Sequence, residues 1–76
     1  MEQEFSAEEI LQALRLEDMA HELGIPHSAM SLRVRTQRFR RLVRQIDSRP
    51  RRRIWHRGDF AAYKRMALVE RKFDGR

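Results

Sequence analysis

Arginine is the residue type in this sequence with the clearest capacity for chemistry, and more than half of its copies lie in two segments. Five fall between residues 33 and 41, and four fall between residues 49 and 53. A guanidinium group is a permanently charged, planar fork of donors that fits phosphate oxygens and the edge of guanine. The two segments therefore predict a surface that binds a polyanion.

The other reactive residue types form no catalytic or metal-binding pattern. His21, His27 and His56 show neither HxxxH spacing nor an acidic neighbour at ligand spacing, so we expect no metal site. No nucleophile is accompanied by a base, and each of the three glycines is accounted for by a turn or a terminus rather than a phosphate-binding loop. The sequence therefore predicts a protein without catalytic activity, cofactor or small-molecule substrate.

Charge is distributed unevenly along the chain. Residues 1–24 contain seven carboxylates and one arginine, a net charge of −6, whereas residues 25–76 contain 16 Lys and Arg and four carboxylates, a net charge of +12. Each phosphate that Lys or Arg neutralises releases condensed counterions, so the basic part favours a nucleic acid as partner. A basic face that serves only solubility is the simpler alternative.

The length of 76 residues allows one domain with a single, marginal core. The chain has no cysteine, which fits a reducing compartment. No apolar run approaches the roughly 20 residues that span a bilayer, and the acidic beginning is unlike a signal peptide. We expect a soluble protein of the cytoplasm, associated with the nucleoid, with no membrane partner.

The first segment reads as a helix with a capping box. Ser6 and Glu9 have the spacing at which each side chain accepts from the backbone amide of the other. Ile10, Leu11 and Leu14 form its expected apolar stripe, which loses its phase at the following acidic residues. This break predicts two helices rather than one.

The next segment predicts a helix, a tight turn and a second helix. Ala20 and Leu23 continue an apolar face, and Gly24 follows where a helix ends in a left-handed residue. Pro26 suits the start of the second helix, for which Ser28 is a candidate cap. A small residue at position 20 allows the two helices to cross closely.

The second half predicts a hairpin and a closing helix. We expect strands over Leu42–Asp47 and Arg51–His56, joined by a turn at Ser48–Pro50. Asp59 is the expected cap of the last helix. Trp55 is expected in the core, because so small a domain needs its single tryptophan for burial.

Together these elements make a winged helix-turn-helix, mainly α with a small β-hairpin. The expected parts of the single domain 1–76 are an acidic N-terminal helix (1–15), a helix-turn-helix (16–38), a basic wing (41–57) and a closing helix (59–73). Residues Ala20 to Ile25 resemble the helix-turn-helix of phage repressors and Cro-like proteins. Residues 16–63 resemble the winged helices of the phage excisionase and MerR-like group, apart from the extra acidic helix and the arginine-rich wing. Arg33 departs from the repressor pattern, which has an apolar residue there.

The resemblance implies a small sequence-specific protein for double-stranded DNA, either a transcriptional regulator or an excisionase-like architectural factor of phage or mobile-element type. The expected contacts from the recognition helix are His27, Ser28, Ser31, Arg33, Arg35 and Arg38, and those from the wing are Arg49, Arg51, Arg52 and Arg53. Arg35 is the leading candidate for a bidentate contact to guanine. We expect a homodimer or a cooperative assembly on DNA, with Leu68, Val69 and Phe73 as the self-association surface.

One alternative remains open. A single long helix from Ser28 to Ile46 would make the chain an all-helical, arginine-rich RNA-binding or protein-interaction module.

Overall fold

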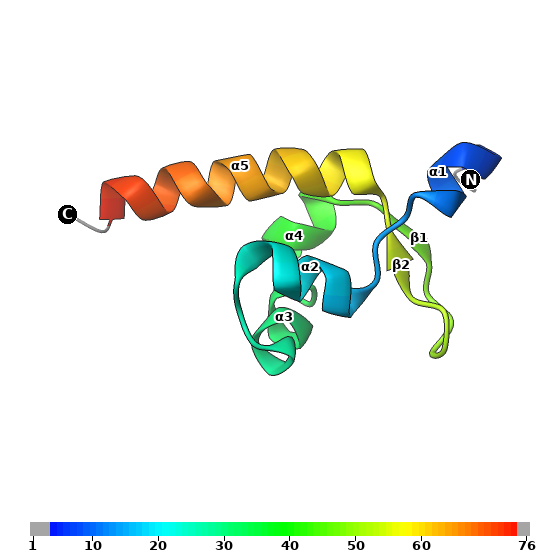
Figure 1. The fold of residues 1–76 in the computed structure, drawn as a ribbon, viewed down its shortest axis with the longest axis horizontal. Helices are drawn as coiled ribbons and strands as arrows, with labels where there is room; N and C mark the ends of the chain where they lie inside the picture. The colour runs from blue at the N-terminus through cyan, green and yellow to red at the C-terminus, as the bar shows by residue number, and fades with distance from the viewer. Residues whose placement is uncertain (1–3, 75–76) are drawn as a thin grey trace.

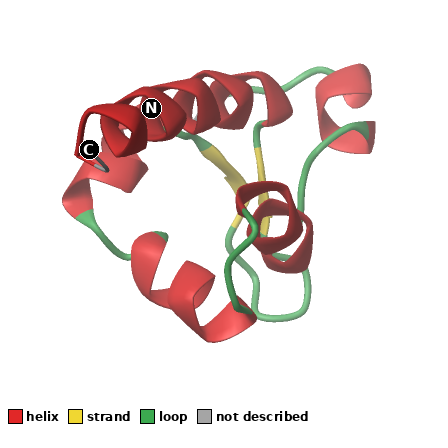
Figure 2. Cartoon of the chain, turned by 60° about the vertical axis from the view of Figure 1, so that its left-hand side comes forward, coloured by secondary structure: helices red, strands yellow, loops and turns green. Residues whose placement is uncertain are grey.

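The computed structural model describes residues 4–74, and the side chains of residues 4–70. Its elements in chain order are α1 (Ala7–Leu11), α2 (Leu16–Leu23), α3 (His27–Arg33), α4 (Gln37–Leu42), β1 (Gln45–Asp47), β2 (Ile54–Trp55) and α5 (Arg57–Asp74). Figure 1 shows α5 across one side of the molecule, with α3 and the tip of the hairpin on the other side. Figure 2 shows that helices make up most of the fold and that the two short strands form one ribbon among them. The expected class, mainly α with a small hairpin, is confirmed.

The capping box at the first helix is confirmed. The Glu9 amide donates to the Ser6 hydroxyl at 3.1 Å, and the Ser6 amide donates to the Glu9 carboxylate at 2.8 Å. The helix is much shorter than expected, however, and none of its residues is buried. Leu11 is 85 % exposed, so its place in an inner stripe was wrong, whereas Leu14 is buried from extended backbone. Five residues make less than two helical turns, which is too short for a continuous buried face.

The turn between α2 and α3 forms as its residues predict. Gly24 has φ 68°, and the amide of Ile25 donates to the Ala20 carbonyl at 3.0 Å, which is a Schellman cap. Pro26 takes the N-cap position of α3. Ser28 therefore lies inside the first turn of the helix, and its expected capping role was wrong.

A short helix stands where part of the first strand was expected. The chain turns at Arg35, and Thr36 starts α4 by accepting from the Phe39 amide at 3.2 Å. Phe39 is completely buried, and the helical spacing from this residue is realised for about one turn, as far as Leu42, before β1 begins. The expected strand over 42–47 was therefore wrong at its first three residues. The long helix of the alternative interpretation is also wrong, because α3 ends at Arg33.

The hairpin is held at its base and is unpaired near its tip. β1 and β2 pair antiparallel with Gln45 opposite Trp55, and a bulge lies in β1. On its other side, Trp55 exchanges backbone hydrogen bonds of 2.8 and 2.9 Å with Leu14. The tip is a turn in which the Arg52 amide donates to the Arg49 carbonyl at 2.9 Å. Pro50 stands at the second position of this turn, where its fixed φ is favourable. The second strand is thus shorter than the expected 51–56.

The closing helix begins two residues before the expected cap. The Asp59 amide donates to His56 Nδ1 at 3.1 Å, so His56 serves the capping function. The carboxylate of Asp59 instead binds Arg44, which the sequence places 15 residues earlier. Asp59 thus lies in the first turn of α5 and was wrong as its expected cap.

One core unites the helices and the hairpin. Phe39, Phe60 and Tyr63 form its aromatic part, with the Phe39 and Tyr63 rings edge to face at 4.9 Å between centroids. Trp55 is 4 % exposed, which confirms its expected place in the core. The buried residues are Leu14, Leu16, Met19, Ala20, Met30, Val34, Phe39, Val43, Trp55, Phe60 and Tyr63. Among the described residues, no helix combines the length and the apolar character needed to cross a bilayer.

Candidate nucleic-acid interface

Helix α3 buries one face and exposes another. Met30 is completely buried and Val34, at its C-cap, is 8 % exposed. His27 and Ser28 are exposed, and Ser31 is partly exposed. The three expected contacts of the first turns therefore have access to a partner.

The arginines after residue 32 divide into two groups according to whether the protein already provides a partner. Five are bound to another side chain or to a carbonyl: Arg33, Arg38, Arg44, Arg49 and Arg57. Among the side chains that the structure describes, seven others make no hydrogen bond or ion pair: Arg35, Arg40, Arg41, Arg51, Arg52, Arg53 and Arg65. The second group is free to bind an anion without breaking a contact.

Two of the expected recognition-helix contacts are turned toward α5. Arg33 Nη1 donates to the Tyr63 hydroxyl at 3.0 Å, and Arg38, on α4, forms an ion pair with Glu70. Both line a groove of 440 Å³ against α5, together with Leu32. The structure thus separates Arg33 and Arg38 from Arg35, which lines a different hollow.

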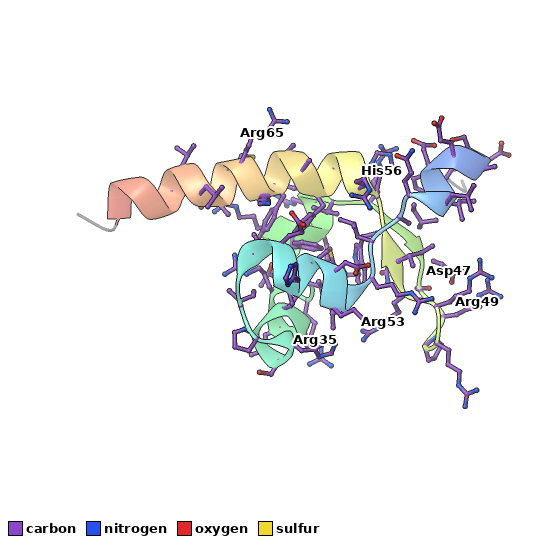
Figure 3. The ribbon with its side chains drawn as sticks, viewed as in Figure 1. Arg35, Asp47, Arg49, Arg53, His56 and Arg65 are labelled. Atoms are coloured by element: carbon purple, nitrogen blue, oxygen red, sulfur yellow. The ribbon has the colours of Figure 1, made fainter. Side chains whose placement is uncertain are left out.

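Arg35 and Arg53 lie around one shallow hollow between the end of α3 and the hairpin. Figure 3 shows both side chains on the side of the molecule away from α5. The hollow has a volume of 240 Å³ and also receives Arg40 from α4. The structure therefore brings together an arginine expected from the recognition helix and one expected from the wing. Arg40 was absent from the expected contacts, and the signal in the sequence is that it lies outside the helical apolar spacing of Phe39 and Val43.

The wing tip contains both free and neutralised arginines. Arg51 and Arg52 are exposed in the turn. Arg49 Nη2 lies 2.6 Å from an oxygen of Asp47, and Figure 3 shows this pair on the outer side of the hairpin. The side-chain hydrogen bonds from Arg49, followed by the bond from its backbone amide, lower the pKa of Asp47 to about 2. Asp47 therefore stays ionised at neutral pH and offsets the charge of Arg49.

The acidic N-terminal helix lies apart from α3. Figure 1 places α1 beside the beginning of α5, on the opposite side from α3. His56 Nε2 contacts the Glu9 carboxylate at 2.8 Å, and Arg57 Nε donates to the Gln12 carbonyl at 2.8 Å. On α2, Glu22 is neutralised by Lys64 at 2.7 Å. Glu9 and Glu22 thus contact His56 and Lys64 rather than the arginines of the hairpin. The described residues also contain no group of three His, Cys, Asp or Glu that could hold a metal ion.

Comparison of the chain with protein-family models, with curated proteins and with solved structures gave no match.

Proposed function

We propose that this chain is a sequence-specific protein for double-stranded DNA with a winged helix-turn-helix, acting as a transcriptional regulator or an excisionase-like architectural factor without catalytic activity. One observation carries the proposal. Arginines without internal partners surround the junction of α3 and the hairpin, whereas several of the other arginines are neutralised by contacts within the fold. A surface that keeps its guanidinium groups unpaired is suited to an extended polyanion. Such a protein would be associated with the nucleoid.

The roles follow from where the side chains lie. In this proposal α3 enters the major groove and presents His27, Ser28 and Ser31 to base edges or nearby phosphates. Arg35 supplies the bidentate contact to guanine, and the tip arginines follow the backbone or enter a narrow minor groove. Arg33 and Arg38 have a lesser role, because each already donates to a residue of α5.

A comparison of three variants tests these roles. Preferred duplexes are first selected from a random pool, and dissociation constants are then measured for a preferred and a random duplex at two salt concentrations. Arg35→Ala should weaken the preferred duplex more than the random one. Replacing Arg51 and Arg52 with Ala should weaken binding to both duplexes. It should also reduce the salt slope, which is the slope of the logarithm of the binding constant against the logarithm of the salt concentration, by about 0.9 per lost phosphate contact.

Arg65→Ala is the matched control for this comparison. Arg65 is also exposed and free of internal partners, but Figure 3 shows it on the far side of α5. Its loss should leave the affinity close to that of the wild type. Equal losses for all three variants would refute the proposed interface, and stronger binding to single-stranded RNA than to any duplex would refute DNA as the partner.

We further propose that two copies associate through α5. Met66, Leu68 and Val69 of this helix are 42 %, 49 % and 53 % exposed. The side chain of Phe73 lies outside the described residues. Sedimentation should show a dimer that Val69→Lys converts to a monomer; a monomeric wild type on its own and on DNA would refute the pairing.

A further inference from the structure

We propose that the hollow between α3, α4 and the hairpin binds a single phosphate group of the nucleic acid backbone, with Arg40 as one of its donors. That the phosphate belongs to a nucleic acid rests on the proposed function. The geometry of the hollow, and its chemistry as an anion site, stand independently of that source.

Three separate segments contribute one arginine each to the lining of this hollow. Arg35 comes from the turn after α3, Arg40 from α4 and Arg53 from the residue before β2. Ser48 and Gln45 add polar groups from the hairpin. The residues that line the hollow include no carboxylate. Several donors converging from different segments match the tetrahedral arrangement of phosphate oxygens better than a single charged side chain does.

The buried residues beside these arginines hold the hollow in place. Val34 and Trp55 line it and are 8 % and 4 % exposed. Arg35 directly follows Val34, and Arg40 directly follows the completely buried Phe39. Trp55 is fixed by backbone hydrogen bonds to Leu14 on one side and by pairing with Gln45 on the other. The backbone that carries the charges is therefore anchored in the core.

Electrostatics favour an anion in this position. Three like charges around one hollow repel one another, and none of the three has a hydrogen-bonding partner among the described side chains. A phosphate would relieve the repulsion by accepting from Arg40, from Arg53 and from Nε of Arg35, which leaves the two Nη atoms of Arg35 for the contact to guanine. The volume of 240 Å³ is several times the roughly 30 Å³ occupied by a water molecule in the liquid, so a phosphate group fits.

A phosphate bound here would determine how α3 lies on the duplex. Contacts to the backbone carry no sequence information, but they fix the orientation of the element that reads the bases. Arg35 adjoins α3 and Arg53 belongs to the hairpin, so one phosphate would connect both. Arg40 is then a positioning residue, whose loss weakens all duplexes in the same proportion.

Arg40→Gln and its matched control Arg41→Gln test this inference. Both residues are exposed on α4 and free of internal partners, but only Arg40 lines the hollow. Far-UV circular dichroism and thermal unfolding first establish that both variants fold as the wild type does. The fluorescence of Trp55, the single tryptophan, is then followed while sodium phosphate replaces sodium chloride at constant ionic strength. The wild type and Arg41→Gln should show a saturable change, and Arg40→Gln should need at least about fivefold more phosphate.

Duplex binding by the same variants identifies the source of the phosphate. Arg40→Gln should lower the affinity for preferred and random duplexes about equally and reduce the salt slope by about 0.9, with Arg41→Gln close to the wild type. Equal effects of the two variants in both assays would overturn the site. A phosphate response without any effect on duplex binding would overturn its assignment to DNA. If the wild type binds phosphate but no duplex, the proposed function fails while the anion site remains.

Discussion

Arg44 binds Asp59 through both its guanidinium and its backbone. Nε and Nη2 donate to the carboxylate at 2.8 and 3.3 Å, and the Arg44 amide donates at 3.1 Å. The contact joins the segment before β1 to the first turn of α5, so it fixes the base of the hairpin against the closing helix. The side-chain hydrogen bonds from Arg44 are the main reason that the pKa of Asp59 lies below its ordinary value of 3.8.

Asp59→Asn should therefore destabilise the fold in a pH-dependent way. A lowered pKa means that the ionised carboxylate stabilises the folded state above pH 3.8, and that this contribution disappears as the pH falls through the folded value. We expect a loss of about 1 kcal/mol at neutral pH, measured by urea unfolding, and a difference from the wild type that shrinks as the pH falls below the ordinary value of 3.8. Glu17→Gln, in an exposed position, is the control. A difference that is constant with pH would contradict the ion pair.

His56→Ala should loosen the attachment of α1. The ring of His56 accepts from the Asp59 amide and contacts the Glu9 carboxylate, and α1 has no buried residue of its own. Loss of an N-cap costs about 1 kcal/mol, and backbone amides of α1 should exchange faster with solvent. His21→Ala removes an exposed histidine and should change neither quantity. Unaltered exchange in α1 would mean that other contacts hold it.

Phe39→Ala should unfold the domain or bring it close to unfolding. The side chain is completely buried and packs on Tyr63, and such truncations cost about 3–5 kcal/mol. A domain of 76 residues has little stability to spare. Leu11→Ala also removes an apolar side chain, but one that is 85 % exposed. The free energy of unfolding, measured by thermal denaturation, should therefore change by less than about 0.5 kcal/mol. Similar losses for both variants would contradict the described core.

Asp47→Asn should release Arg49 for binding to DNA. The amide keeps an acceptor for the Arg49 backbone N–H, which lies 2.9 Å from Asp47, but removes the negative charge. Because the pKa of Asp47 is about 2, the carboxylate opposes Arg49 throughout the usable pH range. We expect tighter binding to random duplexes and a salt slope steeper by up to about 0.9 in gel-shift titrations. An unchanged slope would show that Arg49 does not reach the duplex.

Local hydrogen-bond chemistry was the most predictable part of the fold. The capping box of Ser6 and Glu9 and the left-handed Gly24 depend on neighbours within a few residues, which the sequence displays directly. The presence of a hairpin near Pro50 was predictable for the same reason. The hydrophobicity of Trp55 and the size of the chain were enough to predict its burial.

Features that depend on distant partners were not predictable. Asp59 has the residue type of a helix cap, but Arg44 takes its carboxylate and His56 replaces it. The helical spacing from Phe39 competes with the strand preference of the residues that follow, and packing of α4 against α5 decides in favour of a short helix. Nothing near Arg33 in the sequence indicates Tyr63 as its partner. Only the structure could therefore show which arginines are bound within the fold and which are free.

The pairing of Leu14 with Trp55 also determines when the chain can fold during its synthesis. These two residues are 41 positions apart, and their backbone hydrogen bonds join the N-terminal segment to the hairpin. Phe60 and Tyr63, which complete the core, come later still. Since contacts between distant residues form only after the intervening chain is available, residues 1–63, about four fifths of the polypeptide, must leave the ribosome before the core is complete. Until then, its apolar side chains remain exposed and prone to aggregation.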